Sequence, residues 1–236
     1  MSILQRSWQL IKRVVLILFI AQLIYIIVLK WVFPPVTVIQ LGSWISGHGL
    51  KRDYVSFSEI SPNAGLAVMA AEDQLFPVHN GFDWKSIEKA LKHNEKKPTK
   101  IRGASTISQQ VAKNVFLWNG RSWFRKGLEV YFTFMIELVW GKKRILEVYL
   151  NVSEMGKGVF GIEAASKAYF KKSAKKLTRT EAAKIAACLP NPKKYTVKPV
   201  SKAVQRRYPW VEQQMRNIGP DKDIQALLST EKTKPV

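Results

Sequence analysis

The amino-acid sequence predicts a mainly α-helical domain that is tethered by one N-terminal membrane helix. The first observation is an apolar run from Val14 to Leu29, interrupted only by Gln22. The second is that apolar residues between positions 61 and 218 recur at helical spacing, behind residues that cap helices. Only one short stretch, around Val152 to Phe160, is typical of β structure. Helices should therefore build the domain.

Composition limits the class of partner. The 236 residues include 38 Lys and Arg against 17 Asp and Glu, which leaves a net charge of +21. Such a chain favours anionic partners, namely phosphate groups, nucleic acid or acidic lipid headgroups. The single cysteine, Cys188, excludes an intramolecular disulfide and a metal cluster built from cysteines.

The apolar run approaches the roughly 20 residues that cross a bilayer. Basic residues precede it at Arg6, Lys12 and Arg13. Only Lys30 follows it closely, so the positive-inside rule places the N-terminus in the cytoplasm and the rest of the chain across the membrane. No small-residue cleavage site follows the run, which favours an anchor over a cleaved signal peptide. We expect residues 1–33 to form a cytoplasmic tail and transmembrane anchor.

Residues 34–60 are expected to be a linker with short extended pieces such as 36–39. Ser61 followed by proline is typical of a helix N-terminus, and it opens a domain expected over 61–218. A loose C-terminal tail is expected over 219–236. Later helices are predicted from Asp83 to Leu91, from Ser105 or Thr106 to Val115, from Trp123 to about Trp140, from Lys142 to Asn151, from Gly161 to Phe170, from Ala182 to Leu189 behind a Thr178–Glu181 capping box, and from Ala203 to Ile218.

Two adjacent acids, Glu72 and Asp73, end an apolar helical pattern just before Pro77 and Gly81. A carboxylate at the mouth of an apolar helix is poorly hydrated, which raises its pKa toward that of a general base. The alternative is that both acids are solvated charges at a helix end. Acids there oppose the helix dipole, so structure alone gives little reason for them.

The next polar stretch combines a hydroxyl, an amide and an ammonium near a helix N-terminus. Thr106, Gln110 and Lys113 have the spacing of one helix face, with Asn114 beside them. A helix N-terminus attracts phosphate, so this face is a candidate anion site. An ordinary amphipathic helix is the alternative. A basic segment, Lys92 to Arg102, precedes it as a predicted anion-collecting loop.

A third group lies on the helix predicted from Trp123. Glu129 is surrounded in sequence by apolar residues, and Arg125 precedes it by four residues. A carboxylate in such surroundings is costly unless it is paired or useful, so structural pairing and function both remain open. Trp118, Trp123 and Phe124 are candidates for contact with a membrane interface.

These stretches resemble the signatures of the peptidoglycan glycosyltransferases, glycosyltransferase family 51. Glu-Asp-x-x-Phe-x-x-His-x-Gly at 72–81 is similar to the first signature. Gly-x-Ser-Thr-Ile-x-Gln-Gln-x-x-Lys-Asn at 103–114 and Arg-Lys-x-x-Glu at 125–129 are similar to the second and third. Ile-Leu-Glu-x-Tyr-Leu-Asn at 145–151 and Gly-Ile-Glu-Ala-Ala at 161–165 resemble later ones. The resemblance covers roughly residues 60–195, with every block in order. Position 111 is Val where the family often has Leu.

The resemblance implies a lysozyme-like helical glycosyltransferase domain that polymerises lipid II with inversion, releasing undecaprenyl pyrophosphate. Glu72 matches the general base that activates the acceptor's 4-hydroxyl. Glu129 matches the second essential carboxylate, as an acid or as an organiser of the diphosphate. The residues that match the substrate-binding positions are Asp73, Phe76, His79, Thr106, Gln110, Lys113, Asn114 and Arg125, and among them Lys113 and Arg125 match the cations that meet the diphosphate.

The resemblance further implies lipid II, the growing glycan strand and the bacterial inner membrane as partners, with the catalytic domain on the periplasmic side. Other cell-wall or division proteins are candidate partners. No cofactor is required by the sequence, no protein metal site is expected, and a divalent cation near the diphosphate is left open. No transpeptidase motif follows the matched region, so the monofunctional form is expected.

Two rival functions are considered. A membrane-anchored lysozyme-like hydrolase or lytic enzyme would also use a glutamate in a helical fold. A phosphate-binding face argues against it, because polymeric glycan carries no pyrophosphate. A tethered nucleic-acid binder would explain the charge of +21, but no such motif is present and no nucleic-acid partner is expected.

Overall fold

The computed structural model describes residues 3–99, 103–120 and 122–229. The chain divides into two compact units, Met1–Pro34 and Pro35–Val236. The first unit contains one helix, α1 (Ile3–Val28), of which Leu4–Val28 is long and apolar enough to cross a membrane. A helix of that length spans about 38 Å, more than the roughly 30 Å hydrocarbon core of a bilayer. The predicted apolar N-terminal helix is confirmed, and it begins well before Val14.

The second unit begins earlier than the sequence predicted. Residues 34–60 are not a linker of extended pieces, because they contain helix α2 (Val38–Ile45) and strand β1 (Lys51–Arg52). Thr37 and Gln40 form a capping box at the start of α2, and this local bonding outweighs the β-branched run at 36–39. The domain boundary expected at residue 61 therefore falls inside a compact unit.

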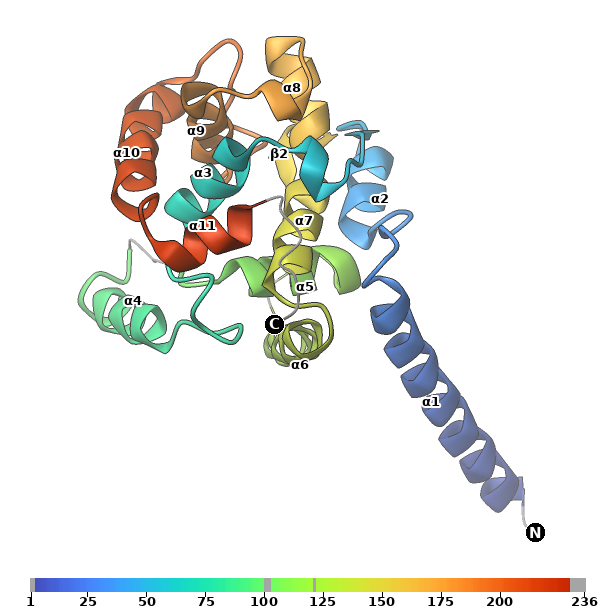
Figure 1. The fold of residues 1–236 in the computed structure, drawn as a ribbon. Helices are drawn as coiled ribbons and strands as arrows, with labels where there is room; N and C mark the ends of the chain where they lie inside the picture. Colours follow the sequence, from blue (N-terminus) through green and yellow to red (C-terminus); the bar gives the residue numbers. More distant parts are fainter. Residues whose placement is uncertain (1–2, 100–102, 121, 230–236) are drawn as a thin grey trace, which may run out of the picture. The chain divides into compact units, whose positions relative to one another are not determined.

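The rest of the domain is mainly helical, as predicted (Figure 1). Its elements are η1 (Phe57–Glu59), α3 (Pro62–Glu72), α4 (Trp84–Lys96), α5 (Ile107–Phe116), α6 (Trp123–Val139), α7 (Lys142–Val152), β2 (Glu154–Gly156), β3 (Val159–Phe160), α8 (Ile162–Phe170), η2 (Ala174–Lys176), α9 (Arg179–Cys188), α10 (Lys202–Ile218) and α11 (Lys222–Leu228). The expected caps Ser61, Asp83, Thr106 and Thr178 each accept a hydrogen bond from the first turn of their helix.

Two groups of helices form the core. The apolar helix α3 packs against α9 and α10, and its residues from Ala64 to Ala70 are buried. Helix α5 packs against α6 and α7. Figure 1 shows α3, α9 and α10 together on one side of α7, with α5 and α6 near the N-terminal end of α7. The junction between α3 and α5 therefore connects the two groups.

The β excursion predicted around Val152 to Phe160 is confirmed as part of a three-stranded sheet in the order β1-β3-β2. Strand β3 pairs in parallel with β1 and antiparallel with β2. Beside the sheet, the Asn151 side chain accepts from the Val55 N–H and donates to the Val55 carbonyl. The Glu147 carboxylate accepts from the Phe57 N–H at 2.7 Å. Both contacts fasten residues 55–57 to α7.

Two further predictions need correction. The basic segment from Lys92 is helical through Lys96 rather than a loop, and its residues 100–102 lie outside the described ones. The tail is not loose directly after Gly219, because α11 follows and buries Ile224 and Leu228 against α3 and α7. Apolar spacing within this short helix was the signal that we missed. Residues 230–236 lie outside the described part.

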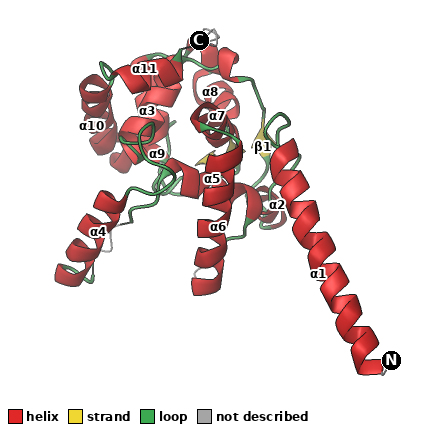
Figure 2. Ribbon diagram, turned by 60° about the horizontal axis from the view of Figure 1, so that its bottom comes forward, coloured by secondary structure: helices red, strands yellow, loops and turns green. Residues whose placement is uncertain are grey.

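Figure 2 shows α4 and α6 extending from the same side of the second unit. Helix α6 carries exposed apolar side chains along its length, among them Phe134 and Leu138. Its first residues are the most exposed, since Trp123 keeps 92% of its surface accessible. Trp118, before α6, is also exposed.

We predict that Gly81→Ala destabilises the domain by about 2 kcal/mol, the scale of a backbone placed in an unfavourable region together with a steric clash. Gly81 has φ of 89°, and an added Cβ would lie 2.8 Å from Thr133 Cγ2 and 3.1 Å from Glu137 Cγ. Thermal unfolding of the full chain in detergent measures the effect. Gly42→Ala is the control, because Gly42 lies within α2 with nothing near its Cβ position, and that variant should be equally or more stable. Equal melting temperatures for both variants would contradict the prediction.

Candidate active site

The site begins where α3 ends. Glu72 is the last residue of α3, and Asp73 is its C-cap. The buried Asp73 carboxylate accepts a hydrogen bond from the Ile107 N–H, at 2.9 Å, at the first turn of α5. An anion at a helix N-terminus is favoured by the helix dipole. Asp73 therefore ties the end of α3 to the start of α5.

His79 supports the same carboxylate. Its Nδ1 accepts from the Gly81 N–H at 3.1 Å, and its Nε2 lies 3.0 Å from both Asp73 oxygens. With Nδ1 accepting, the ring hydrogen is on Nε2, which donates to Asp73. Phe76 is fully buried in this loop, and the Lys142 ammonium lies 4.7 Å from the centre of its ring. The described contacts of Asp73, Phe76 and His79 are with one another, with Gly81 and with residues of α5 and α7.

Thr106 does not share a helix face with Gln110 and Lys113, so that prediction was wrong. Thr106 is the N-cap of α5, and its hydroxyl accepts from the Gln109 N–H. The same hydroxyl donates to the Gly81 carbonyl at 2.7 Å, and the side chain is buried. The i, i+4 count failed because a cap has non-helical backbone and its side chain turns back to the first turn. Thr106 thus closes the loop that begins at Asp73.

Glu72 projects toward α5 and α10. One carboxylate oxygen, Oε2, accepts from the Gln110 side-chain amide at 3.0 Å. The other, Oε1, lies 3.6 Å from Nη2 of Arg207, which also donates to the Ala71 carbonyl. Burial raises the pKa of Glu72 above its ordinary value of 4.5, although Gln110 and Arg207 oppose that shift. The upward direction matches the expectation for a carboxylate at the mouth of an apolar helix.

Tyr149 on α7 determines which way the Gln110 amide faces. The Tyr149 hydroxyl donates to Gln110 Oε1 at 3.3 Å, so the amide nitrogen faces Glu72. Tyr149 is fully buried, and burial raises the pKa of its hydroxyl well above the ordinary value, which keeps it a donor. Glu72 is therefore the acceptor at the end of an ordered chain of side chains.

A second carboxylate lies in a cluster of cations on α6. Glu129 is buried, and its two oxygens accept separately from Arg125 Nη1 at 2.8 Å and from Lys126 Nζ at 2.5 Å. Arg125 is also buried, and its Nε has no hydrogen-bond partner among the described residues. The structural pairing considered for Arg125 and Glu129 is present. The Nε donor of this guanidinium is therefore not used by any described residue.

Lys113 lies within electrostatic reach of both carboxylates. Burial lowers the pKa of Lys113, whereas Glu129 and, to a smaller extent, Glu72 raise it. None of the described residues accepts a hydrogen bond from its ammonium, so the three donors are available to an anion. Asn114 follows on α5, half-buried, and the structure shows no side-chain hydrogen bond for it among the described residues.

Sequence reasoning missed three members of this site. Lys126 lies inside the Arg-Lys-x-x-Glu block, and its spacing to Glu129 was a usable signal. Tyr149 reads as one apolar position of a helix, and only the fold reveals its contact with Gln110. Arg207 lies far along the chain from Glu72, on α10, so no local pattern indicates their contact.

The arrangement can remove a proton in one place and receive negative charge in another. Glu72, a carboxylate with a raised pKa, is suited to accept a proton near neutral pH. Lys113, Arg125 and Lys126 outnumber the single carboxylate among them and are suited to meet an anionic group. Within the described ranges no group of three His, Cys, Asp or Glu side chains could hold a metal ion.

Comparison with known proteins identifies the relatives of this chain. A family profile described as Transglycosylase matches residues 40–216. The chain is 57% identical over 189 residues to the "Biosynthetic peptidoglycan transglycosylase" of Shigella boydii serotype 4 (strain Sb227), covering 79% of this chain and 78% of the relative. It is equally similar, over the same shares, to proteins of that description from Escherichia coli strains ATCC 8739 and K12 / DH10B. The match reaches back to residue 40, in agreement with the early start of the compact domain.

We predict that Glu72→Gln changes how stability depends on pH. Because the pKa of Glu72 is raised by folding, its stabilising contribution is complete below about pH 4.5 and is lost as pH rises through the folded pKa. The glutamine variant lacks that loss, so its melting temperature should exceed that of the wild type increasingly from pH 4 upward, until the difference levels off.

Glu181→Gln is the control of opposite sign. Although burial raises the pKa of Glu181, hydrogen bonds from Lys172 and Thr178 outweigh burial and lower it. Its stabilising contribution is therefore present above the unfolded pKa, and the glutamine variant should melt below the wild type at neutral pH. If the difference in melting temperature between Glu72→Gln and the wild type is the same at every pH, folding does not raise the pKa of Glu72, and the prediction is wrong.

Proposed function

Because the chain belongs to the transglycosylase family and is a peptidoglycan transglycosylase, we propose that it transfers the growing lipid-linked glycan to the 4-hydroxyl of lipid II. The anomeric carbon is inverted, and undecaprenyl pyrophosphate is the leaving group. One observation carries this proposal: the Glu72 carboxylate of raised pKa and the cation cluster of Arg125 and Lys126 both lie within electrostatic reach of Lys113. Proton removal and diphosphate departure need these two environments.

Glu72 is the proposed general base. As the acceptor oxygen attacks C1 of the donor sugar, its proton passes to a Glu72 oxygen. The raised pKa brings the carboxyl toward neutral pH, where a base is both ionised and strong enough to take a proton. Gln110 and Arg207 hold the carboxylate in one orientation before substrate arrives.

The cation cluster is the proposed diphosphate site. Lys113 offers an ammonium that no described residue engages, and Arg125 has an unused Nε. Both oxygens of Glu129 already accept from cations, so we propose that Glu129 orients Arg125 and Lys126 rather than acting as the acid. Asn114, next to Lys113, is proposed as a further substrate contact. Asp73, Phe76, His79 and Thr106 serve this site through the loop that they hold.

We propose that no resident cofactor takes part and that any divalent cation enters with the diphosphate oxygens. Diphosphates carry Mg²⁺ through their own oxygens and need few protein ligands. Removal of divalent ions by EDTA should then change the apparent affinity for lipid II and leave the fold unaltered. Thermal melting with and without EDTA separates these two effects.

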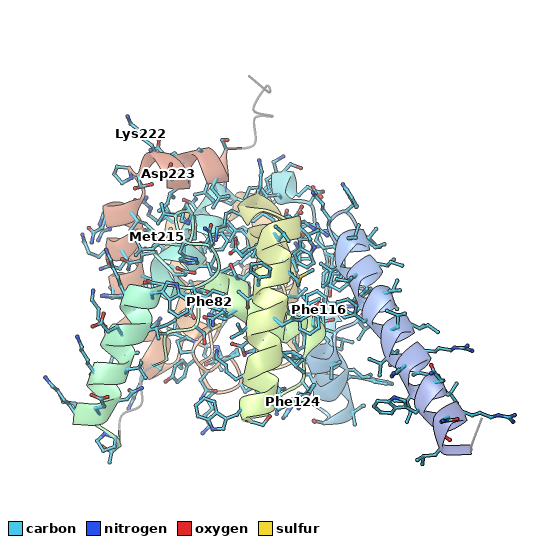
Figure 3. The ribbon with its side chains drawn as sticks, turned by 90° about the horizontal axis from the view of Figure 1, so that it is seen from below. Phe82, Phe116, Phe124, Met215, Lys222 and Asp223 are labelled. Carbon is cyan, nitrogen blue, oxygen red and sulfur yellow. The ribbon has the colours of Figure 1, made fainter. Side chains whose placement is uncertain are left out.

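The cell membrane is the proposed location, with the catalytic domain on the periplasmic side. The described part of the chain has one N-terminal helix suited to a single-pass anchor, and the basic residues before the apolar run support this orientation. Trp123 and Phe124 at the exposed start of α6 are proposed to reach the interface, where lipid II resides. Figure 3 shows Phe124 at that end of α6. Other cell-wall or division proteins remain proposed partners.

We predict that residues 1–33 stay attached to the mature protein and that its C-terminus lies outside the cytoplasm. The motive is the absence of a small-residue cleavage site after the apolar run. N-terminal sequencing and a reporter fused after Val236 measure the two points. A mature N-terminus after Phe33, or a reporter active only in the cytoplasm, would overturn the anchor or its orientation.

We predict that Glu72→Gln abolishes polymerisation of lipid II in a detergent assay, since the amide cannot take a proton. Glu129→Gln should also lower kcat by at least a hundredfold and should, in addition, lower stability, because Arg125 and Lys126 lose a buried counter-charge. Rates are compared well below each variant's melting temperature.

Glu147→Gln is the matched control, because Glu147 pairs with Arg144 at 2.6 Å on α7 outside the site. It should lose stability and keep near-normal kcat. If Glu129→Gln behaves in the same way, Glu129 has only a structural role. Release of soluble sugars from finished peptidoglycan by the wild type would instead favour the lysozyme-like hydrolase.

We predict that Lys113→Ala lowers kcat about a hundredfold or more, equivalent to about 3 kcal/mol of transition-state stabilisation. Negative charge builds on the diphosphate as the glycosidic bond breaks, so the ammonium matters more in the transition state than before it. Lys96→Ala, on the exposed end of α4, is the control and should cost severalfold at most, mainly at low salt. Equal losses that high salt erases in both variants would place the diphosphate elsewhere.

A further inference from the structure

Helix α2 (Val38–Ile45) is arranged with its polar side inward. Its buried residues are Thr37 at the cap, Gln40 and Ser43. Its apolar residues face outward, with 62% of Trp44 and 72% of Ile45 exposed and Val38 and Leu41 also accessible. A surface helix in water normally shows the reverse pattern. The exposed apolar face therefore indicates that α2 does not border water.

Each inward polar side chain has a hydrogen-bond partner. Gln40 bonds to the Tyr54 hydroxyl at 2.8 Å and closes the capping box with Thr37. The Ser43 hydroxyl donates to the Gly49 carbonyl at 3.0 Å. Helix α2 also packs on α5, which carries Gln110 and Lys113. This bonding fixes the rotation of α2 about its axis, so the apolar face cannot turn inward.

We propose that this face, Val38, Leu41, Trp44 and Ile45, rests in the lipid interface of the membrane that holds α1. Residues 29–37 alone separate α1 from α2, and that length reaches at most about 30 Å when fully extended. No acidic residue occurs before Asp53, and the exposed Lys51 and Arg52 suit lipid phosphates. Tryptophan is favoured at such an interface.

The consequence concerns α5. A helix that lies in the interface and packs on α5 places the side of the domain that carries Lys113 at a set height above the lipid. The inference rests on the proposed insertion of α1 and goes beyond it, because an anchor by itself leaves the domain free to tilt. The face is distinct from the exposed start of α6.

Depth measurements on the full chain in nanodiscs test the proposal. Nitroxide labels are attached to Leu41→Cys and Ile45→Cys, with the buried Cys188 left in place and an unsubstituted chain as background. Collisions with oxygen, which concentrates in lipid, are compared with collisions with a water-soluble nickel complex. The oxygen-to-nickel ratio should be severalfold higher at both positions than at the control Gln213→Cys, which is exposed on α10. Labelled variants must still polymerise lipid II in detergent.

Each other outcome overturns the proposal. A ratio at positions 41 and 45 equal to that at 213 means that α2 borders water. Protection from both reagents means that protein covers the face, and dipolar broadening between labelled copies identifies that protein as a second chain. Leu18→Cys on α1 distinguishes the two hypotheses, since a low ratio there means that the anchor itself is not inserted.

Discussion

The hydrogen bond from the Ile107 N–H to the buried Asp73 carboxylate is the contact on which the site depends. It joins the C-terminus of α3 to the N-terminus of α5, and so connects the helix group of α9 and α10 with that of α6 and α7. Because Glu72 immediately precedes Asp73, the bond also places Glu72 against the face of α5 that carries Gln110. A buried carboxylate is stable only with such partners, and His79 supplies the second one.

The later sequence blocks support this junction from a distance. Asn151 and Glu147 fasten residues 55–57 to α7. Glu163 on α8 accepts from the Ala174 N–H at 2.6 Å, and this hydrogen bond joins α8 to η2. The same carboxylate pairs with Lys167 on α8. Their hydrogen bonds explain why polar side chains occur inside otherwise apolar helices. Asn151, Glu147 and Glu163 therefore serve the scaffold, whereas Gln110 of an earlier block bonds directly to Glu72.

Sequence patterns predicted most of the helices because caps and apolar spacing are local. They also predicted the raised pKa of Glu72, because an apolar helix end is a local pattern that indicates burial. They failed at 34–60, where a capping box overrode β-branched residues, and after Gly219, where the cap and apolar spacing of a short helix were overlooked. Thr106 was misplaced because a cap does not follow helical periodicity. Arg207 could not be found at all, since its contact with Glu72 exists only after α10 packs on α3.

Burial shifts the two central charges in opposite directions. It raises the pKa of Glu72 and lowers the pKa of Lys113, so burial opposes the charged form of each group. Each group also lies in the other's field, which favours both charged forms and so opposes the effect of burial. Water would weaken the electrostatic interaction between Glu72 and Lys113. The packing of α3, α5 and α7 around the buried Tyr149 limits the access of water to this region. The site therefore holds its charges in place before an anionic substrate arrives, and the free energy of reorganising them is spent on folding rather than on reaction.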